Sequence, residues 1–71
     1  MSMRPFVIDV YSVNGRNEVS RKRLGSDSLE SALLSAQHLQ ELPSTSRIVI
    51  SRRLGGGGLA KMKVWTRSMA S

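Results

Sequence analysis

Four stretches of this chain are strand-like: the first is rich in β-branched and aromatic residues, and the last alternates between hydrophobic and polar residues. A helical repeat lies between the second and third stretches. Alternation with a period of two is typical of strands that bury one face. The first two stretches, residues 5–13 and 16–24, are joined by Asn14-Gly15. An Asn-Gly dipeptide between strand-like runs favours a tight type I′ turn, in which both central residues have positive φ. We therefore predict a hairpin here.

The register of this hairpin decides which side chains become buried. A two-residue turn directs Arg21 and Arg23 to the same face as the hydrophobic residues of the first strand. Unpaired buried arginines are costly. We therefore expect a bulge near residues 20–22, which turns Leu24 inward instead.

Residues 28–42 carry the helical repeat. One stripe at helical spacing holds Leu29, Ala32, Leu33, Ala36, Leu39 and Gln40. Asp27 followed by Glu30 resembles a capping box, and Pro43 supplies a stop. We therefore predict an amphipathic helix of about four turns over these residues.

Two further strands follow the helix. Residues 47–54 indicate a strand with Ile48 and Ile50 inward, residues 59–67 alternate between hydrophobic and polar, and the four glycines at 55–58 separate the two stretches. We interpret the glycines as a flexible hairpin loop. In the last strand, strict alternation assigns Met62 and Val64 to the buried face.

These elements predict an α+β fold of order β-β-α-β-β. One helix packs on one face of a small antiparallel sheet, and the other face stays open. A chain of 71 residues suffices for a single small domain, which we expect to span residues 1–71. We find no signal peptide and nothing near the roughly 18 apolar residues of a membrane span, so we expect a cytoplasmic protein without a membrane partner.

Charge is distributed unevenly along the chain. Eleven Lys and Arg residues against five Asp and Glu residues give a formal net charge of +6. Between Leu24 and Ser46 there is no Lys or Arg, but three of the five acids lie there. If this middle segment folds as one element, one side of the molecule becomes strongly positive.

The open sheet face is the candidate working surface. We predict that it binds nucleic acid or an acidic partner through Tyr11, Arg47, Arg53, Lys61, Lys63, Trp65 and Arg67. Its cations attract phosphates irrespective of base sequence, and Trp65 and Tyr11 can stack on unpaired bases. The competing interpretation is a merely solvated face, because Lys and Arg on exposed strands also prevent edge-to-edge aggregation.

A second basic cluster extends this surface and consists of Arg16, Arg21, Lys22 and Arg23. Its competing interpretation is a solvated edge, in which Lys22 pairs with Asp9 across the strands.

The glycine run consists of Gly55, Gly56, Gly57 and Gly58. It does not match a phosphate-binding loop of the usual kind, because such a loop leads into a helix. Flanked by cations, it could still wrap a phosphate backbone.

The chain offers little for catalysis or metal binding. It has no cysteine and one histidine, His38, which lies nearly opposite the apolar stripe of the helix. The acids are scattered, and no serine has a basic partner at a recognisable spacing. We therefore expect neither an enzyme nor a metal or cofactor site.

The run Val10–Gln37 resembles the strand–turn–strand–Leu-Gly–helix pattern of integrase arm-binding and AP2-type DNA-binding domains. Those domains use a sheet face on DNA, and the resemblance implies the same use here. They usually place three strands before the helix, whereas two are readable in this chain, and the resemblance covers less than half of it. In size and element order the chain also resembles small phage-encoded inhibitors of host machinery. We assign it to neither family.

The favoured hypothesis is a small, non-enzymatic, basic module that binds DNA or RNA through an open sheet face. The alternative is an inhibitor or adaptor of phage or mobile-element type, which docks its basic face on an acidic host protein. A third hypothesis is a homodimer, because Leu34 and Leu42 lie off the helical stripe and together could form a contact.

Overall fold

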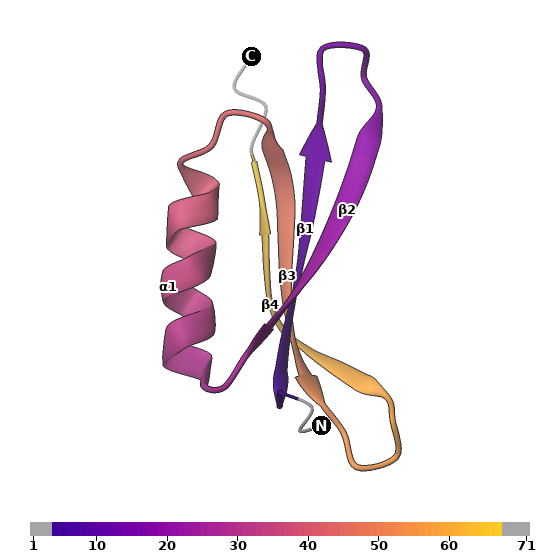
Figure 1. The fold of residues 1–71 in the computed structure, drawn as a ribbon, viewed down its shortest axis with the longest axis vertical. Coiled ribbons are helices and arrows are strands. Elements are labelled where there is room, and N and C mark those ends of the chain that lie inside the picture. The colour runs from indigo at the N-terminus through magenta and orange to yellow at the C-terminus, as the bar shows by residue number, and fades with distance from the viewer. Residues whose placement is uncertain (1–3, 68–71) are drawn as a thin grey trace.

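The computed structural model describes residues 4–67 and has the predicted order of elements. Four antiparallel strands form one open sheet, and one helix connects the second strand to the third (Figure 1). The elements are β1 (Phe6–Val13), β2 (Val19–Ser26), α1 (Leu29–Gln40), β3 (Thr45–Arg53) and β4 (Leu59–Thr66). The predicted β-β-α-β-β fold class is confirmed. No helix in residues 4–67 is long and apolar enough to cross a membrane.

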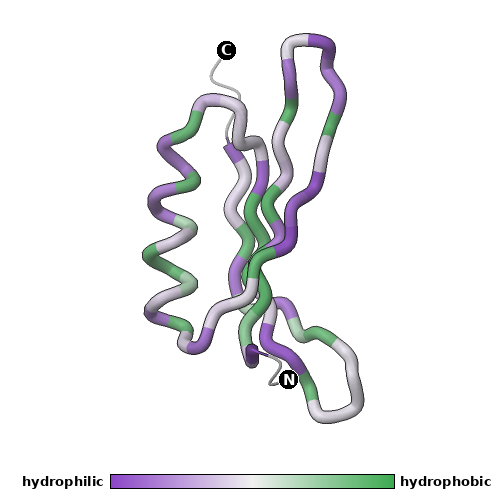
Figure 2. The backbone as a smooth tube through the Cα atoms, in the orientation of Figure 1, coloured by the Kyte–Doolittle hydropathy of each residue, from purple (hydrophilic) through white to green (hydrophobic). Residues whose placement is uncertain are grey.

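The sheet has the strand order β2-β1-β3-β4, so β1 and β3 form its central pair. The central pair is buried on both faces. Ile8, Ile48 and Ile50 face α1 and Val7 and Val49 face the other way, yet all five are at most 5% exposed. Hydrophobic residues accordingly concentrate along the middle of the central strands (Figure 2). Strands buried on both faces carry near-continuous apolar runs, as these two do.

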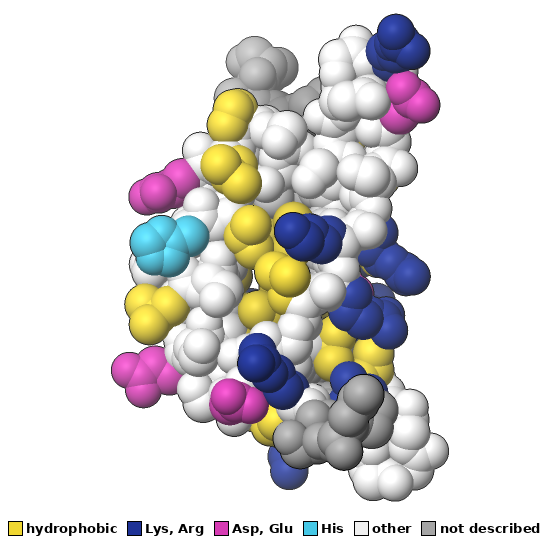
Figure 3. All heavy atoms as spheres, in the orientation of Figure 1, with side chains coloured by type: hydrophobic (Ala, Val, Ile, Leu, Met, Phe, Trp, Pro, Cys, Tyr) yellow, Lys and Arg dark blue, Asp and Glu magenta, His cyan; other side chains and the backbone are white. Residues whose placement is uncertain are grey.

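The fold also separates the charges of the chain. Glu30 lies in the first turn of α1, and the helix carries no Lys or Arg. In the view of Figure 3, most Lys and Arg side chains gather over the sheet, and acidic side chains lie along the helix and at the loops. The uneven charge along the sequence therefore becomes an uneven charge in space.

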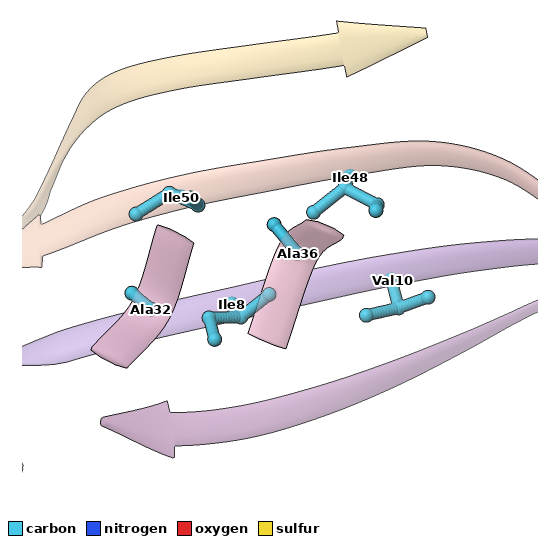
Figure 4. Packing of buried hydrophobic residues seen from close by; sticks show 6 residues of the cluster. All are labelled: Ile8, Val10, Ala32, Ala36, Ile48 and Ile50. Carbon is cyan, nitrogen blue, oxygen red and sulfur yellow. The ribbon is translucent and has the colours of Figure 1, made fainter. Parts of the chain in front are cut away.

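The core lies between α1 and the central strands. Its buried members are Ile8, Val10, Ile48 and Ile50 of the sheet and Ala32 and Ala36 of the helix (Figure 4). Because the two alanines are small, the helix can approach the sheet closely. Every member of the predicted helical stripe is buried or half-buried, so that prediction is confirmed.

The N-terminus of α1 differs from the prediction. Ser28 is the N-cap, and its Oγ accepts a hydrogen bond from the Ser31 N–H at 3.1 Å. Its extended backbone is the conformation that N-cap residues adopt. Asp27 instead lies with Oδ1 3.8 Å from Arg4 Nε. The predicted capping box that begins at Asp27 is therefore wrong.

The first hairpin turns through five residues rather than two. The Asn14 N–H donates to the Glu18 carbonyl and the Asn17 N–H donates to the Asn14 carbonyl, both at 3.1 Å. Asn17 has φ 62°, which marks a type I turn followed by a left-handed residue at a bulge. The Asn14 side chain fixes this turn by accepting from the N–H groups of Arg16 and Glu18 at 2.8 and 3.0 Å. The predicted type I′ turn at Asn14-Gly15 is wrong, because the positive φ belongs to Asn17.

This longer turn changes the register of β1 and β2. Arg23 lies opposite Asp9, and the pairing runs along both strands without a shift. Arg21 and Arg23 therefore lie on the sheet face away from α1, whereas Leu24 packs against the core. The predicted bulge in β2 is wrong, because the turn itself already keeps both arginines out of the core.

The glycine loop repeats the same turn between β3 and β4. The Leu54 N–H donates to the Gly58 carbonyl at 2.9 Å, and the Gly57 N–H donates to the Leu54 carbonyl at 3.1 Å. Gly57, at φ 91°, holds the position that Asn17 holds in the first hairpin. It is therefore the glycine of this loop whose backbone disfavours a side chain.

A bulge in β4 reverses the faces predicted for its second half. Lys61 lies opposite Ser51, but Lys63 lies opposite Ile50, which makes Met62 the extra residue. A one-residue insertion puts every later side chain on the other face. Lys61 therefore keeps its predicted face, and Lys63 does not.

The largest consequence of this bulge is the position of Trp65. It lies opposite Ile48 on the helix side and packs against the core. Met62 and Val64, which we expected in the core, are 46% and 45% exposed. Burying an indole removes more apolar area from water than burying a valine does. This difference favours the observed register, in which Trp65 rather than Val64 faces the helix side.

The two turns give a stability prediction. Gly57→Ala should destabilise the protein by about 1 kcal/mol, because alanine disfavours the left-handed backbone. Gly56→Ala, in the same loop, should leave stability unchanged or raise it by up to about 1 kcal/mol, because it restricts the unfolded chain. Urea unfolding of the two variants measures the difference, and equal effects would contradict this assignment of the turn.

Candidate nucleic-acid interface

The sheet face opposite α1, called the open face below, has a buried floor although no helix covers it. Val7, Asp9, Val49 and Ser51 of the central strands are between 1% and 7% exposed. Each central strand has a neighbour on either side, whose side chains enclose these four positions. The open face is therefore a narrow floor surrounded by longer side chains.

Five cations from three strands surround this floor. The strand registers assign to the open face Arg21 and Arg23 of β2, Arg47 and Arg53 of β3, and Lys61 of β4. Among the strand positions in residues 4–67, Asp9 is the acid on this face. The open face thus carries five positive charges against one negative charge.

Asp9 and Arg23 form an ion pair on this face. Arg23 Nε donates a hydrogen bond to Asp9 Oδ1 at 2.8 Å. The Asp9 side chain is 9% exposed and that of Arg23 is 51% exposed. The hydrogen bond to Asp9 and the charge of its carboxylate raise the pKa of Arg23 above its ordinary value. The pair satisfies a buried carboxylate, which would be costly alone, and fixes the guanidinium over the face.

Tyr11 and Arg47 form a second contact on the open face. The two residues lie opposite each other in the sheet, and Arg47 Cζ lies 5.8 Å from the centre of the Tyr11 ring. This distance is within the range of a cation–π interaction. Arg21 lies opposite Tyr11 on its other side. An aromatic ring between two cations can stack on a base while the cations meet phosphates.

Arg53 and Arg4 extend the positive surface toward one end of the sheet. Arg53 Nε donates to the Arg4 carbonyl at 3.1 Å, and Arg4 Nη1 donates to the Gly25 carbonyl at 3.2 Å. A guanidinium has five N–H groups. Each of these side chains therefore keeps donors available for a ligand.

Lys63 and Trp65 do not belong to this surface. Both lie on the helix side of β4, and Arg67 Cζ lies 5.3 Å from the Trp65 ring. The prediction that they share a face with Lys61 is wrong, because the bulge at Met62 changes the phase of the strand. Trp65 contributes to the core rather than to a stacking platform.

Arg67 connects the end of β4 to the end of α1. Its Nη2 donates to the carbonyls of Gln40 and Leu42 at 2.9 and 2.8 Å, and its Nε donates to the Thr45 carbonyl at 2.9 Å. The last carbonyls of a helix lack partners and carry partial negative charge, so a guanidinium stabilises them. Arg67 has a structural role, and its predicted place on the open face is wrong.

The structure divides the second basic cluster. Arg21 and Arg23 join the open face, whereas Lys22 lies on the helix side. Arg16 lies in the loop of the first hairpin. The pair between Lys22 and Asp9, which the competing interpretation offered, is not formed, because Arg23 lies directly opposite the carboxylate.

The glycine loop lies at the opposite end of the sheet from the first hairpin (Figure 1). It follows Arg53, and all of its glycines are exposed. That Gly55–Gly58 wrap a phosphate backbone stays a prediction.

Sequence reasoning missed the Asp9–Arg23 pair and the part that Arg4 plays. A signal for the pair is present in the sequence. An aspartate within the apolar run of β1 requires a charged partner, and an arginine on the neighbouring strand is a good candidate. For Arg4 no periodic pattern exists, because it precedes the first strand.

Comparisons of the chain with protein-family models, curated proteins and solved structures found no match. Within residues 4–67, no group of three His, Cys, Asp or Glu side chains could hold a metal ion. Function must therefore be argued from the open face itself.

The contacts of Arg67 give a second stability prediction. Arg67→Ala should lower the free energy of unfolding by about 1–2 kcal/mol, because three charge-assisted hydrogen bonds to carbonyls are lost at a partly hydrated site. Arg52→Ala is the control: it removes the same charge from an exposed position on β3. Equal losses in the two variants, measured by urea unfolding, would show that Arg67 does not hold the helix end.

Proposed function

We propose that this protein is a small cytoplasmic module that binds DNA or RNA through the open face, without catalysis. The observation that supports the proposal most is the gathering of five cations around one acid on a face that no helix covers. Cations on a surface attract the phosphate backbone and release its counterions. Binding should therefore depend strongly on salt and weakly on base sequence.

The spacing of the cations suits a flexible strand. Arg21 and Arg23 are about 7 Å apart along β2, and Arg21 and Arg47 are two strand spacings, about 10 Å, apart across the sheet. The cations are thus spread both along the strands and across the sheet. Tyr11 lies between Arg21 and Arg47, where an unpaired base can stack on it. This arrangement favours single-stranded nucleic acid.

One observation favours the alternative, an acidic protein partner. Val64 lies opposite Val49 on the open face and is 45% exposed, so the face includes an apolar spot within its cations. Protein interfaces often combine an apolar centre with a polar rim. A partner protein would be captured from a nuclease-treated lysate, whereas the nucleic-acid proposal requires direct binding to purified oligonucleotides.

Two double variants on the same strands test which face binds. Arg21→Ala/Arg47→Ala removes two cations from the open face, and Lys22→Ala/Arg52→Ala removes two from the helix side. Fluorescence anisotropy with a labelled single-stranded oligonucleotide at several salt concentrations measures both. The first variant should bind severalfold more weakly, and its log–log salt slope should fall by about 1.4, since each phosphate contact on a single strand contributes about 0.7.

The second variant is the matched control, because its net charge is the same. It should stay close to the original protein in affinity and slope. Equal losses in both variants would mean that only the net charge matters, and no measurable binding by the original protein at low salt would overturn the proposal.

Asp9 supplies a prediction of the opposite sign. Asp9→Asn keeps the shape of the side chain but removes the acid from the open face. Arg23, no longer bound to a carboxylate, becomes free to meet a phosphate. We expect tighter binding and a salt slope steeper by about 0.7. Unchanged or weaker binding by a folded Asp9→Asn variant would show that Arg23 does not contact nucleic acid.

A further inference from the structure

The helix covers only part of its side of the sheet. An α-helix is about 10 Å wide and strands are about 4.8 Å apart, so one helix covers about two strands. In this fold α1 packs on β1 and β3 and reaches β2, whereas no Cα of α1 lies within 8 Å of a Cα of β4. A groove of about 500 Å³ remains between α1 and β4.

The lining of this groove is mainly apolar. Leu33 and Leu34 come from α1, Ile48 and Ile50 from β3, and Lys63 and Trp65 from β4. Leu34, on the helix wall, is 53% exposed. The groove is thus an apolar recess that runs alongside a helical ridge.

The ridge and the recess lie side by side, so a second copy of the chain can offer a ridge to the recess. A two-fold axis that runs parallel to α1, just outside the mouth of the groove, would lay the helix of each copy into the recess of the other. Such a contact is isologous, so one pair of complementary surfaces is used twice. Leu34 of each copy would then meet the groove of its partner.

The charges of the two surfaces are complementary. Glu30 lines the helix wall, and α1 carries no Lys or Arg. Lys63 lines the opposite wall, and β4 carries no acid. A rotation about an axis parallel to α1 leaves the height of each residue along that axis unchanged. Glu30 of one copy would therefore face the region of Lys63 in the other. Opposite charges at these places offset part of the repulsion between two basic chains.

We propose that the groove between α1 and β4 is the interface of a two-fold homodimer, in which Leu34 of each copy packs against Trp65 and the apolar floor of the other. The groove lies on the helix side of the sheet, so both open faces stay exposed in the dimer. The proposal does not depend on nucleic-acid binding.

Sedimentation velocity over a range of concentrations tests the dimer. Protein freed of nucleic acid by nuclease and high salt should reach twice the 7.8 kDa of one chain at high micromolar concentration. Leu34→Asp should raise the dissociation constant at least about tenfold. Leu54→Asp is the matched control and should change it little, because Leu54 is similarly exposed, at 47%, but does not line the groove.

A charge exchange tests the relative placement of the two walls. Glu30→Lys and Lys63→Glu should each weaken the dimer severalfold, and the double variant should restore it. Emission of Trp65, the single tryptophan, gives a second readout and should shift to longer wavelength on dilution.

A monomer at every concentration would overturn the proposal. A dimer that tolerates Leu34→Asp, or that Leu54→Asp disrupts equally, would place the interface elsewhere. Urea unfolding of each variant separates loss of the dimer from loss of the fold.

Discussion

Within residues 4–67, β2, β4 and α1 all pack on the pair of strands β1 and β3. Both strands are buried on both faces of the sheet, although the helix covers only one of these faces. On the helix side, Ile8, Ile48 and Ile50 meet the small alanines of α1. On the other side, Val7 and Val49 are shielded by the side chains of their neighbours. In so short a chain, this pair supplies most of the apolar burial that stabilises the fold.

This arrangement explains why the cations gather where they do. An uncovered face above buried valines is best enclosed by long side chains that shield the floor with their stems and keep their charges in water. Four arginines meet that requirement: Arg21, Arg23, Arg47 and Arg53. The acids, by contrast, lie mostly on or beside α1, where Glu30 in the first turn also suits the helix dipole. The same arginines therefore suit a solvated rim that shields the floor and a surface that binds phosphates. Binding measurements distinguish these two explanations.

The sequence predicted the elements well and their faces only in part. The apolar, β-branched composition of β1 and β3, the alternation in β4 and the helical repeat of α1 are local patterns that do not depend on the partner, so they located these elements. The turn at Asn17 and the bulge at Met62 are single-residue features, and each one reverses a whole segment. Strict alternation therefore placed Trp65 on the open face and Val64 in the core, the reverse of the structure. Strand order was also beyond the pattern, and it is the strand order that puts β3 beside β1 and so brings Arg47 next to Tyr11.

Under the proposed function, the open face, and not the basic protein as a whole, contacts nucleic acid. The most direct test is a two-dimensional amide NMR titration of the labelled protein with a short single-stranded oligonucleotide at moderate salt. We predict shift changes at Tyr11, Arg21, Arg23, Arg47 and Lys61, and none at the Trp65 indole or along α1. Changes confined to the helix side, or no changes at any residue, would show that the open face does not bind nucleic acid.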